Sequence, residues 1–107
     1  MKVLHDECMD HRHRHEMPGH DVKTVEQMGW ASTKNGKLLR LAADAGFGAF
    51  VTVDQGISYQ NDIASIEIAV FVLKAESNSR TMLKPLFPQL LAIIDTTAPR
   101  TVTIIGA

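Results

Sequence analysis

Short strand-like segments alternate with helix-like segments along this chain. The strand-like segments are rich in valine, isoleucine and threonine, and they lie at residues 2–5, 21–25, 49–53, 66–73 and 101–105. Between them, residues 37–45 and 78–95 carry apolar side chains at helical spacing. Strands that alternate with helices form a mostly parallel sheet covered on both faces, so we expect a three-layer α/β/α sandwich.

Local signals mark the ends of the helical segments. A proline–glycine pair follows the polar, helix-compatible residues 9–17. Gly46 stands where a C-terminal capping glycine is expected, and Asn78 is a suitable N-cap for the last helix. Pro85 and Pro88 lie inside that last helix and predict a kink or a late start.

The composition suits one compact domain. The chain has 107 residues, of which 45% are hydrophobic, so we expect a single domain over residues 1–107. The one cysteine, Cys8, excludes an internal disulfide and fits a reducing, cytoplasmic compartment. No segment has the length and hydropathy of a membrane span, and the first apolar run is too short for a secretory signal. The net charge of −1 lacks the basic excess of dedicated nucleic-acid binders.

Two predicted strands end in an acidic residue. LHDE places Asp6 and Glu7 after the first strand, and VTVD places Asp54 after the third. If these strands are neighbours, about 4.8 Å apart, the two aspartates can share a cation at the ligand-binding edge of the sheet. Without a cation they would repel, and one would take up a proton. One or two carboxylates, water and substrate phosphate are the usual ligands of Mg²⁺, which favours metal-assisted phosphodiester hydrolysis.

A structural role for the same acids stays open at this point. Aspartate is frequent after strands because it stabilises turns and caps helices. Asp6 could simply be the N-cap of the segment at residues 9–17.

The order of several short motifs resembles a family of short PIN-like proteins. The motifs are LHDE, PGHDV, MGW, KNG, VTVDQ and YQND, which together cover about residues 1–75. The later run SNSRTMLKPLFPQLL is similar in style to the last helix of that family. Their joint occurrence is more specific than any single motif.

The resemblance implies a PIN-like α/β/α fold and a metal-dependent ribonuclease that cuts single-stranded RNA. It implies catalytic roles for Asp6, Glu7 and Asp54, with Asp6 and Asp54 as ligands of Mg²⁺ or Mn²⁺. Proteins of this kind include the toxins of toxin–antitoxin pairs, so the implied partners are an RNA substrate and a cognate antitoxin protein.

The chain departs from this family at the start of the second helix. Many relatives have an acid there, whereas this chain has Asn35, which can ligate a metal but adds no charge. Asp62 or Glu67 could compensate. The departure favours an alternative function, a catalytically inactive PIN-like module that binds a partner protein or nucleic acid.

Polar residues near the acids are candidates for substrate binding. Lys34, beside Asn35, can contact a phosphate group, although the favoured alternative is a solvated loop lysine. The residues that follow Asp54 can contact a nucleotide or hold the acids in place: Gln55, Tyr59, Gln60 and Asn61.

The histidine-rich segment is open to several interpretations. His11 and His15 have a spacing that suits zinc on an α-helix. We favour instead a basic surface formed with Arg12 and Arg14 that contacts RNA phosphate, with a solvated helix face as the alternative. His13 is expected to face the core.

Three further features have a functional and a structural interpretation. Cys8 could be a catalytic thiol paired with a nearby histidine, or an inert side chain. Trp30 could stack on a base or pack in the core. Apolar residues of the last helix cover more than one stripe and predict a homodimer through that surface: Leu83, Leu86, Phe87, Leu90 and Leu91.

Overall fold

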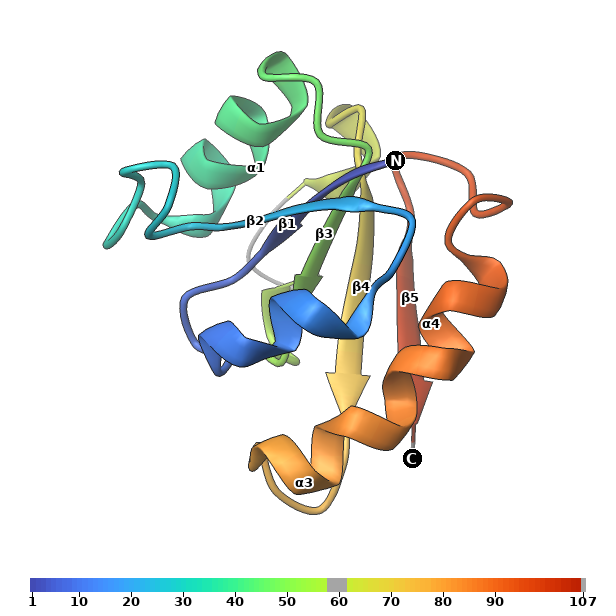
Figure 1. Ribbon diagram of the computed structural model, residues 1–107. Helices are drawn as coiled ribbons and strands as arrows, with labels where there is room; N and C mark the ends of the chain where they lie inside the picture. The colour runs from blue at the N-terminus through green and yellow to red at the C-terminus, as the bar shows by residue number, and fades with distance from the viewer. Residues whose placement is uncertain (58–61, 107) are drawn as a thin grey trace.

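The chain forms a five-stranded parallel sheet with helices on both faces (Figure 1). The computed structural model describes residues 1–57 and 62–106. The sheet order is β2-β1-β3-β4-β5, and all neighbouring strands are parallel. The strands are β1 (Lys2–His5), β2 (Asp21–Thr24), β3 (Ala49–Thr52), β4 (Ala69–Lys74) and β5 (Val102–Gly106). The expected α/β/α sandwich with a parallel sheet is confirmed.

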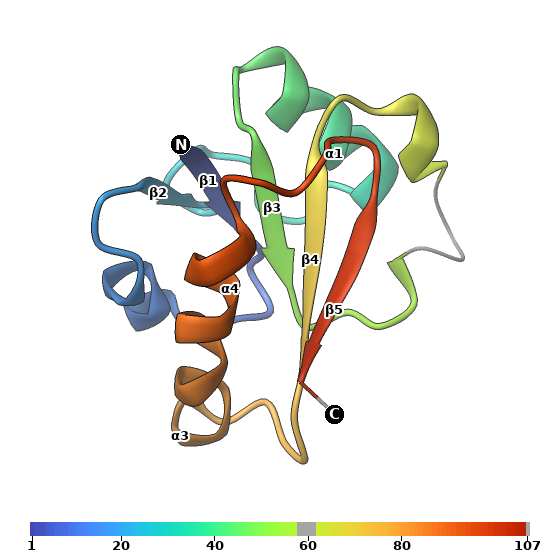
Figure 2. The ribbon, with the colours of Figure 1, turned by 90° about the vertical axis from the view of Figure 1, so that its right-hand side faces the viewer.

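Helices cover the two faces of the sheet separately (Figures 1 and 2). On one face lie α1 (Asn35–Asp44) and the short 3₁₀ helix η2 (Ile63–Ser65). The other face is covered by η1 (His11–Glu16), α3 (Arg80–Leu83), η3 (Lys84–Leu86) and α4 (Phe87–Ile93). Among the described residues, every helix is too short or too polar to cross a membrane.

Side chains of the three central strands alternate between two hydrophobic cores. In β1, Val3 belongs to the core that contains Leu90 of α4, whereas Leu4 belongs to the core that contains Leu39 of α1. This alternation follows from the two-residue period of a strand. A central strand covered on both faces must therefore be apolar throughout, and β4 has this pattern in the sequence.

Prolines divide the last helical segment, as expected. Pro85 lies in η3, which interrupts the helix between α3 and α4, and Pro88 lies in the first turn of α4. The predicted N-cap is wrong by one residue. The N-cap is Ser79, whose hydroxyl accepts a hydrogen bond from the Met82 N–H at 3.3 Å, and not Asn78.

The apolar side chains of the last helix, which predicted a dimer, pack against the sheet of the same chain. Four of the five side chains named for it are buried against the sheet, and Leu91 is partly buried beside the same core. The last helix therefore gives no reason of its own for self-association.

The start of β4 differs from the sequence prediction, whereas the predicted end of α1 is confirmed. β4 begins at Ala69 and not at residue 66, because η2 and its C-cap at Ile66 occupy the preceding residues. At the end of α1, Gly46 has a φ of 88°, which is the left-handed conformation expected of a capping glycine.

The strand order places a topological switch point between β1 and β3. From β1 the chain moves outward to β2, and it then returns past β1 to form β3 on the other side. In parallel α/β sheets, the crevice beyond the carboxyl ends of two such strands is the usual place for a ligand.

Candidate functional site

The two strand-end aspartates lie at this switch point. β1 pairs directly with β3, with His5 opposite Val51. The Asp6 N–H continues the ladder by donating to the Val51 carbonyl at 2.9 Å. Asp6 and Asp54 thus follow adjacent parallel strands at one edge of the sheet, as the sequence predicted.

A buried threonine connects the two acids. The Thr52 hydroxyl donates to Asp6 Oδ2 at 2.7 Å and accepts a hydrogen bond from the Asp54 N–H at 3.0 Å. Thr52 is fully buried, and Asp6 is only 8% exposed. The sequence interpretation counted Thr52 only as a β-branched strand residue. The sequence signal that could have identified Thr52 is its hydroxyl group two positions before Asp54, the acid at the end of the strand.

Asp54 is held by the start of α1. Its Oδ2 accepts a hydrogen bond from the Asn35 side-chain amide at 3.0 Å, and its Oδ1 accepts one from the Gly56 N–H at 2.9 Å. Asn35 is the first residue of α1, so the carboxylate also lies near the positive end of that helix. Asn35 therefore belongs to the site, where its amide orients Asp54.

Asp6 stabilises a turn and does not cap a helix. Its Oδ1 accepts from the Glu7 N–H at 2.8 Å, and its backbone carbonyl accepts from the Met9 N–H. The cap of η1 is Asp10, whose Oδ1 accepts from the Arg12 N–H at 2.9 Å. The alternative that Asp6 caps this segment is thus wrong.

The Cys8 thiol belongs to the hydrogen-bond network of the acids. It donates to Asp6 Oδ2 at 3.4 Å and lies 3.7 Å from the Thr52 hydroxyl. Although part of Cys8 is exposed, desolvation of the thiol raises its pKa, and the charge of Asp6 acts in the same direction. A thiol that stays protonated is a poor nucleophile, so this environment favours the inert interpretation.

The other predicted site residues surround this network less closely. Glu7 is exposed, and its Oε1 accepts from the Ser32 N–H at 3.0 Å. Lys34 and Gln55 are exposed beside Asn35 and Asp54 in the chain. Three candidates lie outside the described residues: Tyr59, Gln60 and Asn61.

Trp30 packs against the core. Its ring makes an edge contact with Phe47, with the ring centroids 6.1 Å apart. This contact favours the packing interpretation over base stacking.

The carboxylates of Asp6 and Asp54 are ligands that suit Mg²⁺ or Mn²⁺ when water completes the coordination shell. They are too few to bind a metal ion through protein ligands alone. Residues 1–57 and 62–106 contain no group of three or more His, Cys, Asp or Glu side chains that could hold a metal. Asp6 Oδ1 and both Asp54 oxygens each accept one hydrogen bond from the described residues. Each of these oxygens keeps a second lone pair, which a magnesium ion with several waters can use.

Glu67 does not supply a further carboxylate. It forms an ion pair with Arg100 at 2.6 Å, and both residues precede their strands at the amino end of the sheet. The acids Asp6 and Asp54 lie at the opposite end. Asp62, the N-cap of η2, joins no metal-binding group in the described part of the chain.

The arginines of the histidine-rich segment are engaged locally. η1 is a 3₁₀ helix with three residues per turn, so His11 and His15 do not align as they would on an α-helix. Arg12 donates to both oxygens of Asp10, at 3.0 and 2.6 Å, and Arg14 donates to the His11 carbonyl. The Asp10 carboxylate offsets the charge of Arg12, so the positive charge that the sequence assigned to this surface is reduced, although Arg14 keeps its own charge.

His13 faces the core, as predicted. It is fully buried, and its ring stacks on Phe87 with the centroids 5.0 Å apart. Burial lowers the pKa of His13. Burial also lowers the pKa of the neighbouring His5 to about 4, with a smaller contribution from His13 in the same direction.

Comparisons of the chain with protein-family models, curated proteins and solved structures find no significant match. The function is therefore argued from the geometry of the aspartate pair and from the motif resemblance.

Proposed function

We propose that this chain is a metal-dependent ribonuclease that acts on single-stranded RNA and is the toxin component of a toxin–antitoxin pair. The observation that carries the proposal is the position of Asp6 and Asp54 on adjacent strands, linked through Thr52 at the switch point. The toxin role rests on the PIN-like motifs alone.

The residues of the site divide into ligands and supports. Asp6 and Asp54 would hold Mg²⁺ or Mn²⁺, which supplies Lewis-acid activation of the phosphodiester and of water when bound. Thr52 and Asn35 orient the two carboxylates through their hydrogen bonds. Glu7, which follows Asp6 in the chain and is exposed, would orient water.

Two exposed residues next to Asn35 and Asp54 in the chain would contact the substrate. Lys34 is exposed immediately before α1, where its ammonium group can meet a phosphate of the RNA. Gln55 is exposed immediately after Asp54, where its amide can contact a nucleotide.

A second candidate function is an inactive module that binds a partner. It is favoured by the hydrogen bonds that the carboxylates of Asp6 and Asp54 already accept within the chain, and by an amide at position 35 in place of an acid.

The two functions are separated by a cleavage assay with a fluorescent single-stranded oligoribonucleotide in Mg²⁺, Mn²⁺ or EDTA. We expect cleavage in the metal ions, and we expect Asp6→Asn and Asp54→Asn to reduce it to the EDTA rate. Asp95→Asn is the matched control, because Asp95 is exposed beyond α4. Wild-type protein that cleaves no faster than Asp54→Asn would favour the binding module. Growth arrest on expression of the wild type, but not of Asp54→Asn, tests the toxin role.

A further inference from the structure

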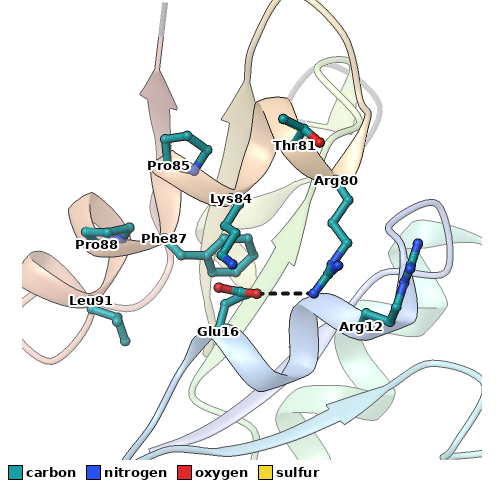
Figure 3. A pocket seen from close by; sticks show the side chains of 9 residues that line it. All are labelled: Arg12, Glu16, Arg80, Thr81, Lys84, Pro85, Phe87, Pro88 and Leu91. Carbon is teal, nitrogen blue, oxygen red and sulfur yellow. Dashed lines mark ion pairs between the residues drawn. The ribbon is translucent and has the colours of Figure 1, made fainter.

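A groove separates η1 from the α3–η3–α4 segment, on the sheet face opposite α1 (Figure 3). Its volume is about 670 Å³, within the range of pockets that bind small ligands or a few side chains. The apolar part of the lining includes Pro85, Phe87, Pro88 and Leu91. Arg12, Arg80 and Lys84 contribute cationic groups, and Glu16 is the acidic group in this lining.

Arg80 has unused hydrogen-bonding capacity in this groove. Its ion pair with Glu16 spans 3.8 Å, which is too long for a hydrogen bond. Its Nε is buried and has no hydrogen-bond partner within residues 1–57 and 62–106. A guanidinium group presents five N–H donors in a planar fork that matches a carboxylate. The Arg80 side chain is 39% exposed, so an anionic group in the groove can approach its guanidinium group.

The groove keeps a positive charge after its ion pairs are counted. Asp10 neutralises Arg12, and Glu16 offsets Arg80. Lys84 has no ion pair in the described part of the chain and is exposed. A local positive charge in a chain of net charge −1 favours an acidic occupant.

We propose that this groove binds a segment of a partner protein in which apolar side chains are flanked by carboxylates. The apolar side chains would lie on Pro88 and Leu91, and a flanking carboxylate would pair with the exposed part of the Arg80 side chain, which is 39% exposed. This interaction surface is distinct from the Asp6–Asp54 site and goes beyond the proposed nuclease activity.

The lining favours a peptide over single-stranded nucleic acid. Base recognition in such grooves relies on exposed aromatic rings. Phe87 is the aromatic residue of this lining, but it is 1% exposed and its ring already stacks on His13. Proline and leucine surfaces suit aliphatic side chains instead.

The test is a fluorescence-anisotropy titration of the full chain with the fluorescein-labelled hexapeptide EELLEE. Two matched peptides separate the contribution of the carboxylates to binding from that of the leucines. QQLLQQ lacks the charges, and EESSEE lacks the apolar side chains. We expect EELLEE to bind and both matched peptides to bind more weakly. Loss of a charge-assisted hydrogen bond should make Arg80→Gln bind EELLEE roughly tenfold more weakly.

Arg40→Gln is the matched control, because Arg40 lies on α1 on the other face of the sheet. Lys84→Gln is a second test at an exposed position, where folding is least affected. Asp54→Asn should bind EELLEE as tightly as the wild type, because Asp54 lies outside the groove. Peptide binding can therefore be tested separately from nuclease activity.

The proposal is overturned by any of three results. These are no saturable binding of EELLEE up to about 1 mM, equal binding by the Arg80→Gln and Arg40→Gln variants, or displacement of the peptide by oligouridylate that depends on Arg80. The last result would make the groove a nucleic-acid site.

Discussion

At the scale of single residues, one buried hydroxyl group fixes the geometry of the candidate site. Thr52 donates to the Asp6 carboxylate through a buried hydrogen bond and accepts a part-buried one from the Asp54 backbone, so it restrains the Asp6 side chain and the Asp54 main chain together. We predict that Thr52→Val, which keeps the shape but removes the hydroxyl, lowers the free energy of unfolding by about 2 kcal/mol. Urea titration at neutral pH measures this change.

Thr52→Ser is the control for this prediction, because it retains the hydroxyl and loses only a methyl group. It should preserve the hydrogen bonds and any metal-dependent activity better than Thr52→Val does. A valine variant as stable as the wild type would show that the bridging hydroxyl contributes little.

At the scale of elements, His13 joins η1 to α4 through its stack on Phe87. Burial lowers its pKa, whereas an unfolded histidine titrates near pH 6.5. Below that pH the unfolded chain binds the proton more readily than the native chain, so stability is lost as the pH falls. We predict that His13→Phe reduces the loss of stability between pH 7.5 and 5, by at most about 1.4 kcal/mol per pH unit.

Urea titrations at the two pH values test this prediction. His5, whose pKa is lowered to about 4, titrates in the same direction, so the comparison must be made between variants. His15→Phe is the matched control, because His15 is exposed on η1. An equal pH dependence in wild type and His13→Phe would contradict the prediction.

Elements whose signals are local could be predicted from the sequence. The β-branched residues of the strands, the capping glycine after α1 and the prolines near α4 act within a few residues. The η1 segment was harder to predict, because its 3₁₀ form is associated with the Asp10 cap and the burial of His13 against α4. The late start of β4 likewise reflects η2, which the apolar run IEIAVFVL does not reveal.

At the scale of the whole molecule, the features that decide function depend on long-range packing. The predicted adjacency of β1 and β3 is confirmed, but it rested on the aspartate after each strand, because alternating strands and helices do not specify which strands are neighbours. Asn35 looked like a missing acid until α1 placed its amide on Asp54. The positive groove brings Arg12 together with Arg80 from distant parts of the chain, so the net charge of −1 conceals it.

Metal binding should be visible as a change in the stability of the whole domain. An ion that binds only the folded state adds RT ln(1 + [L]/Kd), or about 2.7 kcal/mol at a hundredfold excess over Kd. For a domain of this size, that corresponds to a rise in Tm of roughly 10 °C. We predict such a rise for the wild type in millimolar Mn²⁺ and for the Asp95→Asn control, but not for Asp6→Asn or Asp54→Asn.

The same melting series tests how the two carboxylates behave without metal. Sequence alone suggests that they repel, so that Asp6→Asn would raise or preserve the Tm. In the structure, Asp6 accepts hydrogen bonds from the Glu7 N–H and the Thr52 hydroxyl, which offset that repulsion. An asparagine amide would have to face the hydroxyl, so we expect a small fall in the metal-free Tm. A wild type indifferent to Mn²⁺, with Asp6→Asn equally stable, would remove the metal site and leave the partner-binding module as the function that the fold supports.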